Sequence, residues 1–184
     1  TANIGLENTD ITTNERGAIV VNDTCESSVP GVYAVGDVNG GPQFTYISLD
    51  DFRIVFGALT GNGQYTLKDR KNIPYTTFLT PPLARVGLTE EDAINKGYTV
   101  KTKEMLVATM PRAHVNDYLK GAFKIVVNAE NNLILGATLY SQGAEELINL
   151  IKMAMDNNIP YTYFKNQIFT HPTMAENLND LCNF

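Results

Sequence analysis

Hydrophobic side chains recur at helical spacing in the first half of the chain, and this periodicity predicts one long helix there. The pattern covers residues 45–59, with Thr45 in the N-cap position and the glycine-rich turn 60–63 directly after it. The apolar side chains fall on a single stripe, as in an amphipathic helix. This stripe consists of Leu49, Phe52, Phe56 and Leu59.

Two apolar runs before that helix are typical of strands. Residues 11–22 combine a turn around Gly17 with a run of β-branched residues. Residues 32–35 are apolar on both faces, which favours a buried strand of a parallel sheet. This run ends at Gly36 and Asp37, and a glycine-rich loop follows.

A polar, turn-rich segment at residues 61–74 separates this first unit from a second one with a different pattern. The predicted units are residues 1–68 and 74–184. In the second unit short strands and helices alternate, which predicts an α+β meander. Strands are expected at residues 75–80, 83–89, 98–107, 121–128 and 132–141, and helices at 89–97, 143–158 and 172–184.

Composition and charge narrow the functional classes. The 184 residues are 43% hydrophobic, so we expect a sizeable buried core. The net charge is −6 and no basic patch is interleaved with aromatic residues, which argues against a nucleic-acid partner. No stretch reaches the roughly 18 apolar residues of a membrane span, and no secretion signal is visible. The chain starts without methionine, in what reads as the middle of a domain, so we expect a piece of a longer protein.

The two cysteines form no recognisable metal or disulfide motif. Cys25 and Cys182 lie far apart in the sequence and belong to no CxxC or CxxxxC pair. Neither a zinc site nor a disulfide scaffold is therefore expected. Two reduced thiols in the cytoplasm are the simplest interpretation.

Gly36 and Asp37 form the first candidate site. A carboxylate at the carboxyl end of a parallel strand faces the crevice in which such sheets bind ligands, and it can accept hydrogen bonds from sugar-type hydroxyls. The helix that starts near Thr45 would point N–H groups and its positive end into the same crevice, which favours negative charge, as on a reduced flavin ring. On this motif alone, the simpler interpretation of an aspartate that caps a turn is favoured.

His171 and Glu176 form the second candidate site. An imidazole is suited to accept a proton near neutral pH. A carboxylate five residues later can fold back, bond one ring nitrogen and fix the tautomer. A structural histidine that caps a helix fits this spacing equally well. The other histidine, His114, has no partner at a telling distance and is interpreted as structural or exposed.

Seven motifs follow one another along essentially the whole chain. Taken together, they resemble the C-terminal part of the flavoprotein disulfide reductases, the family of lipoamide dehydrogenase and glutathione reductase. The motifs are GLEN at 5–8, GAIVVN at 17–22, VPGVYAVGD at 29–37, ARVGLTEEDA at 84–93, GAFKIVV at 121–127, ILGATLYSQGAEELI at 134–148 and HPTMAE at 171–176.

The resemblance implies a fold and a partner. The first unit would be the end of an α/β FAD-binding domain. The second unit would be an α+β dimerisation domain with an antiparallel sheet and flanking helices. His171 and Glu176 match the family's His–Glu pair, in which the histidine of one subunit serves the redox dithiol of the other. A homodimer is therefore implied, with His171 in a loop that projects into the neighbouring active site.

The resemblance also implies FAD and NAD(P)H as cofactors of the full-length protein. By position, Asp37 matches the aspartate that binds the ribitol of FAD, and Gly36 lets the backbone come close. Gln43, Phe44 and Thr45 match the segment whose backbone approaches the flavin ring. The implied reaction passes electrons from NAD(P)H through FAD and a dithiol to a disulfide or metal acceptor.

Several family motifs are absent from these 184 residues, namely the CxxxxC dithiol and both GxGxxG loops. We therefore expect the chain by itself to be inactive and to bind FAD poorly, if at all. The C-terminal vicinal cysteine pair of mercuric reductases is also absent. The sequence at residues 40–55 and 169–181 is most similar to a bacterial branch linked to defence against reactive chlorine and to copper(II) reduction.

The sequence is also compatible with two other functions. One is an interaction module whose only activity is self-association, which is compatible with being the dimerising part of an enzyme. The other is a structural domain reused without a redox partner.

Overall fold

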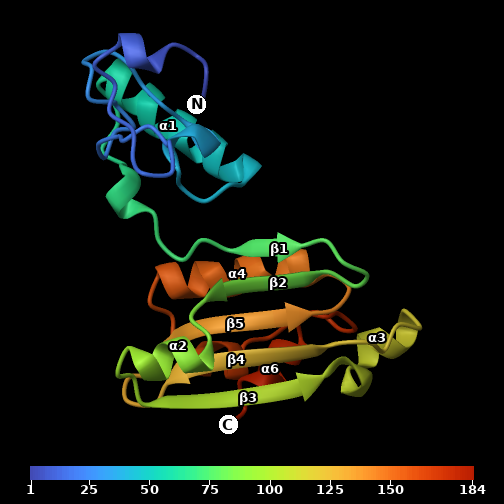
Figure 1. Ribbon diagram of the computed structural model, residues 1–184. Helices are drawn as coiled ribbons and strands as arrows, with labels where there is room; N and C mark the ends of the chain where they lie inside the picture. Colours follow the sequence, from blue (N-terminus) through green and yellow to red (C-terminus); the bar gives the residue numbers. More distant parts are fainter. The chain divides into compact units, whose positions relative to one another are not determined.

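The computed structural model of the protein describes residues 1–184 and contains two compact units, Thr1–Lys71 and Asn72–Phe184. Each unit has its own helices, and the second contains a sheet (Figure 1). None of the helices combines the length and the apolar character that crossing a membrane requires.

The first unit consists of one α-helix and long stretches of turns. The helix, α1, covers Thr45–Thr60 and ends at Gly61, whose φ of 71° is the left-handed conformation that favours glycine. Its predicted extent is confirmed, although Phe44 and not Thr45 is the N-cap residue. Three 3₁₀ turns accompany it: η1 (Leu6–Asn8), η2 (Gly36–Asn39) and η3 (Leu67–Asp69).

The apolar stripe predicted for α1 does not face the interior of this unit. Its four side chains are between 50% and 64% exposed. The residues that α1 buries are instead Ile47, Asp51 and Ile54. Both sets recur every three to four residues, so spacing alone does not select the buried face. The selection follows from which segments of the unit pack against the helix.

The strands predicted within residues 11–22 and 32–35 do not form in the first unit. Each range takes part only in one isolated antiparallel bridge. Val32 and Val35 are 39% and 41% exposed, so this run is not a buried strand. A strand of a parallel sheet needs a hydrogen-bonded neighbour, and residues 1–71 contain no strand that provides one.

The second unit is built on a five-stranded antiparallel sheet, which confirms the expected α+β arrangement. The strand order is β1-β2-β5-β4-β3, with β5 in the centre (Figure 1). The tight turn at residues 129–132 joins β4 to β5. The strands are β1 (Tyr75–Thr77), β2 (Leu83–Gly87), β3 (Val100–Leu106), β4 (Ala122–Asn128) and β5 (Ile134–Tyr140).

Helices of the second unit bury one face of the sheet. Of these helices, α4 packs against β5 and β2, and α6 packs against β3 and β4, behind the sheet in the view of Figure 1. Phe123 of β4 and Leu139 of β5 are fully buried in this core. The helices are α2 (Glu90–Asn95), α3 (Pro111–Val115), α4 (Ala144–Asp156), α5 (Tyr161–Asn166) and α6 (Asn177–Leu181).

Three of these helices differ from the sequence-based expectation. The sequence pattern predicted neither α3 nor α5, because a helix of five or six residues is too short to show a periodicity. The helix expected at residues 172–184 is limited to α6. A bend and a turn occupy residues 174–176 before α6. There Oγ1 of Thr173 accepts a hydrogen bond from the N–H of Glu176, a group that a helix starting at residue 172 would pair with a backbone carbonyl.

Candidate functional site

His171 lies on the surface of the second unit and is bonded to Glu176. Its Nδ1 is 2.8 Å from Oε2 of Glu176. The His171 side chain is 68% exposed, whereas that of Glu176 is 18% exposed. The ring therefore uses Nδ1 within its own chain, and no hydrogen bond within the chain occupies Nε2. An exposed ring nitrogen in a set orientation is placed to exchange a proton with a group outside the chain.

Thr173 holds Glu176 in place, and the sequence analysis did not identify it. The backbone N–H of Thr173 donates to Oε1 of Glu176 at 3.0 Å, and the N–H of Glu176 donates to Oγ1 of Thr173 at 3.2 Å. The two bonds have the reciprocal pattern of a capping box, for which T-x-x-E is the sequence signal, but they lie in the turn before α6, whose N-cap residue is Glu176. Hydrogen bonds from His171, and then from Thr173, hold the pKa of Glu176 below its usual value. The carboxylate is therefore charged at neutral pH.

His114 has a different environment. It belongs to α3, and its Nε2 lies 2.8 Å from the carbonyl oxygen of Ala108. No carboxylate bonds its ring. This contact within a local turn is consistent with the structural role expected for His114, and it makes this residue a natural control for His171.

In the first unit, the turn η2 presents Asp37 at the surface. Gly36 before it is buried, has a φ of 72°, and lies so close to α1 that a Cβ atom would be 2.6 Å from Oγ of Ser48. Asp37 is exposed, and its carboxylate makes no hydrogen bond or ion pair within the chain. Its side chain therefore does not cap the turn, and it is free to accept hydrogen bonds from another molecule.

The start of α1 belongs to the same part of the first unit, because Ser48 in its first turn contacts Gly36. Phe44 is the N-cap, and no side chain caps this end of the helix. Gln43 before it and Thr45 after it are exposed. The N-terminus of a helix of this length carries partial positive charge, which favours an anionic group nearby. The predicted ligand-binding residues of the first unit are thus gathered around one turn and one helix end.

An ion-pair network that the sequence analysis missed lies beneath this turn. Asp51 is 0% exposed, and its Oδ2 accepts hydrogen bonds from the N–H of Gly36 at 2.8 Å and from Nδ2 of Asn39 at 2.9 Å. Arg70 forms an ion pair with Oδ1 of Asp51 and another, at 2.8 Å, with Oδ2 of Asp50. Burial alone would lower the pKa of Arg70, but its bonds to the two carboxylates outweigh burial and raise it.

Neither cysteine is available for chemistry at the surface. Cys25 and Cys182 are free thiols and both are buried, which confirms that they form no disulfide with each other. Burial, with a smaller contribution from the charge of Asp51, raises the pKa of Cys25 to about 11. Burial raises the pKa of Cys182 to about 12. No group of three or more His, Cys, Asp or Glu side chains is arranged to hold a metal ion.

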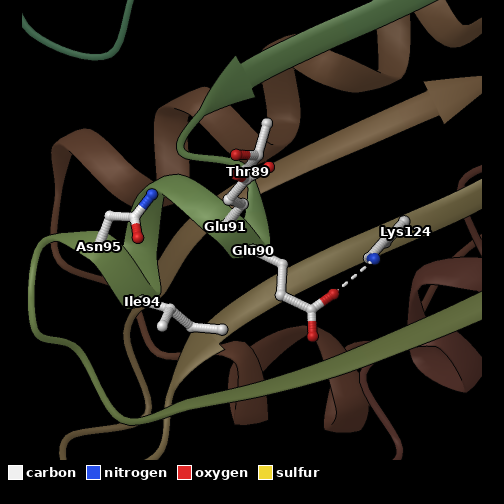
Figure 2. A pocket seen from close by; sticks show the side chains of 6 residues that line it. All are labelled: Thr89, Glu90, Glu91, Ile94, Asn95 and Lys124. Carbon is white, nitrogen blue, oxygen red and sulfur yellow. Dashed lines mark hydrogen bonds and ion pairs between the residues drawn. The ribbon is translucent and has the colours of Figure 1, made fainter.

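A surface pocket of about 440 Å³ lies beside α2, and none of the predicted site residues lines it (Figure 2). Nζ of Lys124 lies 2.6 Å from Oε2 of Glu90, and this pair is exposed to solvent. The pocket contains no histidine or cysteine, so its lining offers neither an imidazole base nor a thiol. The lining residues are Thr89, Glu90, Glu91, Ile94, Asn95 and Lys124.

Comparison with known proteins identifies the family. The model described as "Pyridine nucleotide-disulphide oxidoreductase, dimerisation domain" matches residues 73–182, which is more than half of the chain. A second model, described as "Pyridine nucleotide-disulphide oxidoreductase", matches residues 1–51.

Individual relatives agree with these matches. The probable pyridine nucleotide-disulfide oxidoreductase RclA of Escherichia coli is 48% identical over 181 residues, which are 98% of this chain and 41% of that protein. Mercuric reductase of Staphylococcus aureus is 34% identical over 178 residues, 97% of this chain and 32% of that protein. The solved Cu(II) complex of the HOCl-induced flavoprotein disulfide reductase RclA from Escherichia coli has a TM-score of 0.95 at 48% identity, covering 98% of this chain and 42% of that one.

The chain thus spans about two fifths or less of the length of these relatives. Proteins of the family depend on FAD and NAD(P)H, and the model that matches residues 73–182 is that of the family's dimerisation domain. Three observations on this chain agree: the seven motifs in order, the antiparallel sheet of the second unit and the two family matches. The chain belongs to the pyridine nucleotide-disulphide oxidoreductase family.

Proposed function

We propose that the chain is the C-terminal portion of an FAD-dependent pyridine nucleotide-disulfide oxidoreductase. Residues 1–68 would complete its FAD-binding domain, and residues 74–184 would form its dimerisation domain. The arrangement of His171 and Glu176 carries this proposal. The ring is exposed and held through Nδ1, which leaves Nε2 available to a group outside this chain. Such a group is the redox dithiol of a partner subunit.

In this proposal, Nε2 of His171 accepts the proton of a thiol on the partner subunit, which makes that sulfur a thiolate. When the acceptor is a disulfide, the same nitrogen later returns the proton to a thiolate of the reduced product. Glu176 accepts the hydrogen bond of Nδ1–H, which sets the tautomer, and its charge stabilises the positive ring that forms. Thr173 orients Glu176 through their two reciprocal hydrogen bonds.

The residues of the first unit fit FAD. The exposed carboxylate of Asp37 has no partner in the chain, so it is available to hydroxyl groups of a ribityl chain. Gly36 lets the backbone of the turn come close to α1. The start of α1, near Gln43 and Thr45, has no side-chain cap and favours negative charge on a flavin ring beside it. When bound, FAD supplies the transfer of electrons between NAD(P)H and the dithiol.

A mixed-dimer experiment on the full-length protein tests the role of His171. One subunit carries His171→Ala and the other lacks the dithiol, so that each homodimer is inactive. If the histidine serves the partner's dithiol, the heterodimer has one intact site and about half of the wild-type turnover. If it serves its own subunit, the heterodimer is inactive and the proposal is wrong. The matched control is His114→Ala, for which turnover stays near that of the wild type.

The acceptor is proposed as a disulfide or a metal ion. Because the chain is similar to RclA, of which a Cu(II) complex has been solved, copper(II) should be assayed as an acceptor alongside lipoamide and glutathione disulfide. Cys182 is a single buried thiol, so this chain lacks the C-terminal cysteine pair expected of a mercuric reductase. Turnover of the full-length enzyme with each acceptor under NADH and NADPH would rank them.

A second candidate is a module that only associates with itself. It is favoured by apolar side chains that the second unit leaves exposed, since Phe78 is 80% and Ile168 is 90% exposed. Sedimentation of the chain should show a dimer at tens of micromolar, because obligate interfaces bury about 2,000 Å² or more. A dimer whose full-length form neither retains flavin nor turns over would favour this candidate over the enzyme.

A further inference from the structure

Asp51 contacts the turn η2 on both sides of Asp37. Its Oδ2 accepts from the backbone N–H of Gly36 at 2.8 Å, immediately before Asp37, and from the side-chain amide of Asn39 at 2.9 Å, two residues after it. The same Asn39 amide also donates to the carbonyl of Ala34 at 3.3 Å. One buried carboxylate oxygen of α1 therefore bonds the short segment that carries Asp37 on both sides of that residue.

The charge of Asp51 is retained in the interior because Arg70 neutralises it. An unpaired buried carboxylate would be strongly unfavourable, whereas a paired one with its oxygens hydrogen-bonded is tolerated. Arg70 follows η3 in sequence and bridges Asp51 and Asp50, so α1, η2 and η3 meet at this ion pair. Asp50 pairs with the same arginine but makes no hydrogen bond with the turn η2. Its hydrogen bonds reach Arg70 and Tyr65, but none reaches the turn.

Gly36 allows the turn to lie close to α1, because no side chain would fit at this position. A Cβ at Gly36 would lie 2.6 Å from Oγ of Ser48, so the backbone is already at closest approach to α1. On the far side of the turn, the carbonyl of Val38 accepts a hydrogen bond from the N–H of Ile19 at 2.9 Å. Between these two contacts, the charged carboxylate of Asp51 accepts the hydrogen bonds of Gly36 and Asn39.

We propose that Asp51, held by Arg70, is a positioning residue that orients the exposed carboxylate of Asp37 for the hydroxyl groups of a bound polyol chain. This inference rests on the proposed function, which makes that chain the ribityl part of FAD. Asp51 itself does not touch the ligand. It acts by keeping the turn in its binding conformation before the ligand arrives, which avoids the entropy of ordering it on binding.

The test compares Asp51→Asn with Asp50→Asn in the full-length protein. Asn at position 51 keeps the shape of the side chain but removes its charge. Its NH₂ group would also face groups that themselves donate hydrogen bonds to Asp51, namely Gly36, Asn39 and Arg70. We expect the dissociation constant of FAD to rise about tenfold or more, with an altered visible circular dichroism of the residual bound flavin. For Asp50→Asn, which keeps the bonds to the turn, we expect a change of less than about threefold.

Hydrogen exchange on the 184-residue chain gives a second readout that needs no flavin. In Asp51→Asn the Gly36 amide should exchange about tenfold faster or more, while the Ile54 amide, within α1, keeps its rate. Equal acceleration at both amides would mean general loss of stability and would overturn a positioning role. If Asp51→Asn does not fold, Arg70→Lys replaces it, because lysine keeps the charge but cannot bridge both carboxylates. The same pattern is then expected, with smaller changes.

The outcomes separate the two proposals. A wild-type full-length protein that binds no FAD overturns the proposed function and this inference with it. A wild type that binds FAD, with an Asp51→Asn variant that binds it equally tightly and protects Gly36 equally well, overturns the inference alone.

Discussion

Thr173 and Glu176 bond each other's backbone amides, so the carboxylate that holds His171 is itself held by a neighbour three residues away. Oγ1 of Thr173 also donates to the carbonyl of Thr170 at 2.8 Å, which joins the two sides of the loop. The orientation of the exposed ring is thus set by a chain of local hydrogen bonds, whereas burial contributes little to it.

Replacing Thr173 by valine should weaken both the loop and the proposed activity. The variant keeps the size of the side chain but loses the acceptor for the Glu176 amide, which for such a capping residue costs about 1 kcal/mol of unfolding free energy. Turnover of the full-length enzyme should fall, because Glu176 no longer holds the ring in one orientation. Thr162→Val is the control, since no side-chain hydrogen bond of Thr162 is lost. Equal turnover in the two variants would contradict the orienting role.

Acid should remove the contribution of Glu176 to stability. Its pKa in the folded chain is held below the usual value of 4.5, so its hydrogen bonds to His171 and Thr173 stabilise the fold fully above that pH. The contribution is lost as the pH falls below 4.5 and through the folded-state pKa. Glu176→Gln should therefore be less stable than the wild type at about pH 6, and the difference should shrink toward about pH 3. Urea unfolding at both pH values measures this, and a difference that does not change with pH would be the contrary result.

The two faces of α1 should respond differently to truncation. Ile54 is 1% exposed, so Ile54→Ala should lower the unfolding free energy of the first unit by about 2–5 kcal/mol. Phe52 on the apolar stripe is 54% exposed, so Phe52→Ala should change it by less than about 0.5 kcal/mol in the isolated chain. Urea denaturation followed by circular dichroism compares them. The reverse order of sensitivity would mean that the stripe, and not Ile54, faces the interior.

Both thiols should be unreactive in the folded chain. Burial raises the pKa of Cys25 to about 11 and that of Cys182 to about 12, so almost no thiolate is present near neutral pH and access is blocked. A thiol reagent at about pH 8 should label neither residue until urea is added, and then should label both. Rapid labelling of Cys182 under native conditions would show that the C-terminal segment opens.

Much of the second unit was predictable because its signals are local. In α4 the spacing of four side chains predicts one helix face, which consists of Leu147, Ile148, Ile151 and Met155. The first three are buried, and Met155 is partly buried against the same core. Turn residues and alternating strands likewise predicted an antiparallel sheet, because three of its four strand pairs join strands that are neighbours in sequence. The meander expected from the sequence is wrong at the centre of the sheet, where β2 pairs with β5. The family was recognisable for a similar reason, since seven short motifs occur in order.

The first unit shows what local signals miss. The run at residues 32–35 has the composition of a parallel strand, but a parallel partner must come from elsewhere in a chain, and residues 1–71 offer none. The stripe on α1 is apolar and exposed, while Asp51 on the same helix is charged and buried. Arg70, 19 residues away in sequence, makes that burial possible by forming an ion pair with Asp51. The periodicity of α1 contains no signal for this ion pair.

The sequence by itself determined the family, the sheet-and-helix composition of the second unit and the chemical types at both candidate sites. It also allowed the His171–Glu176 contact, because five residues of chain are enough for the carboxylate to return to the ring. Only the tertiary structure decided which face of α1 is buried, that Asp37 keeps its carboxylate free, and that Asp51 and Arg70 support the turn beneath it. The physical reason is that hydrogen bonds and ion pairs between segments distant in sequence depend on where the whole chain folds, whereas periodicity and capping act within a few residues.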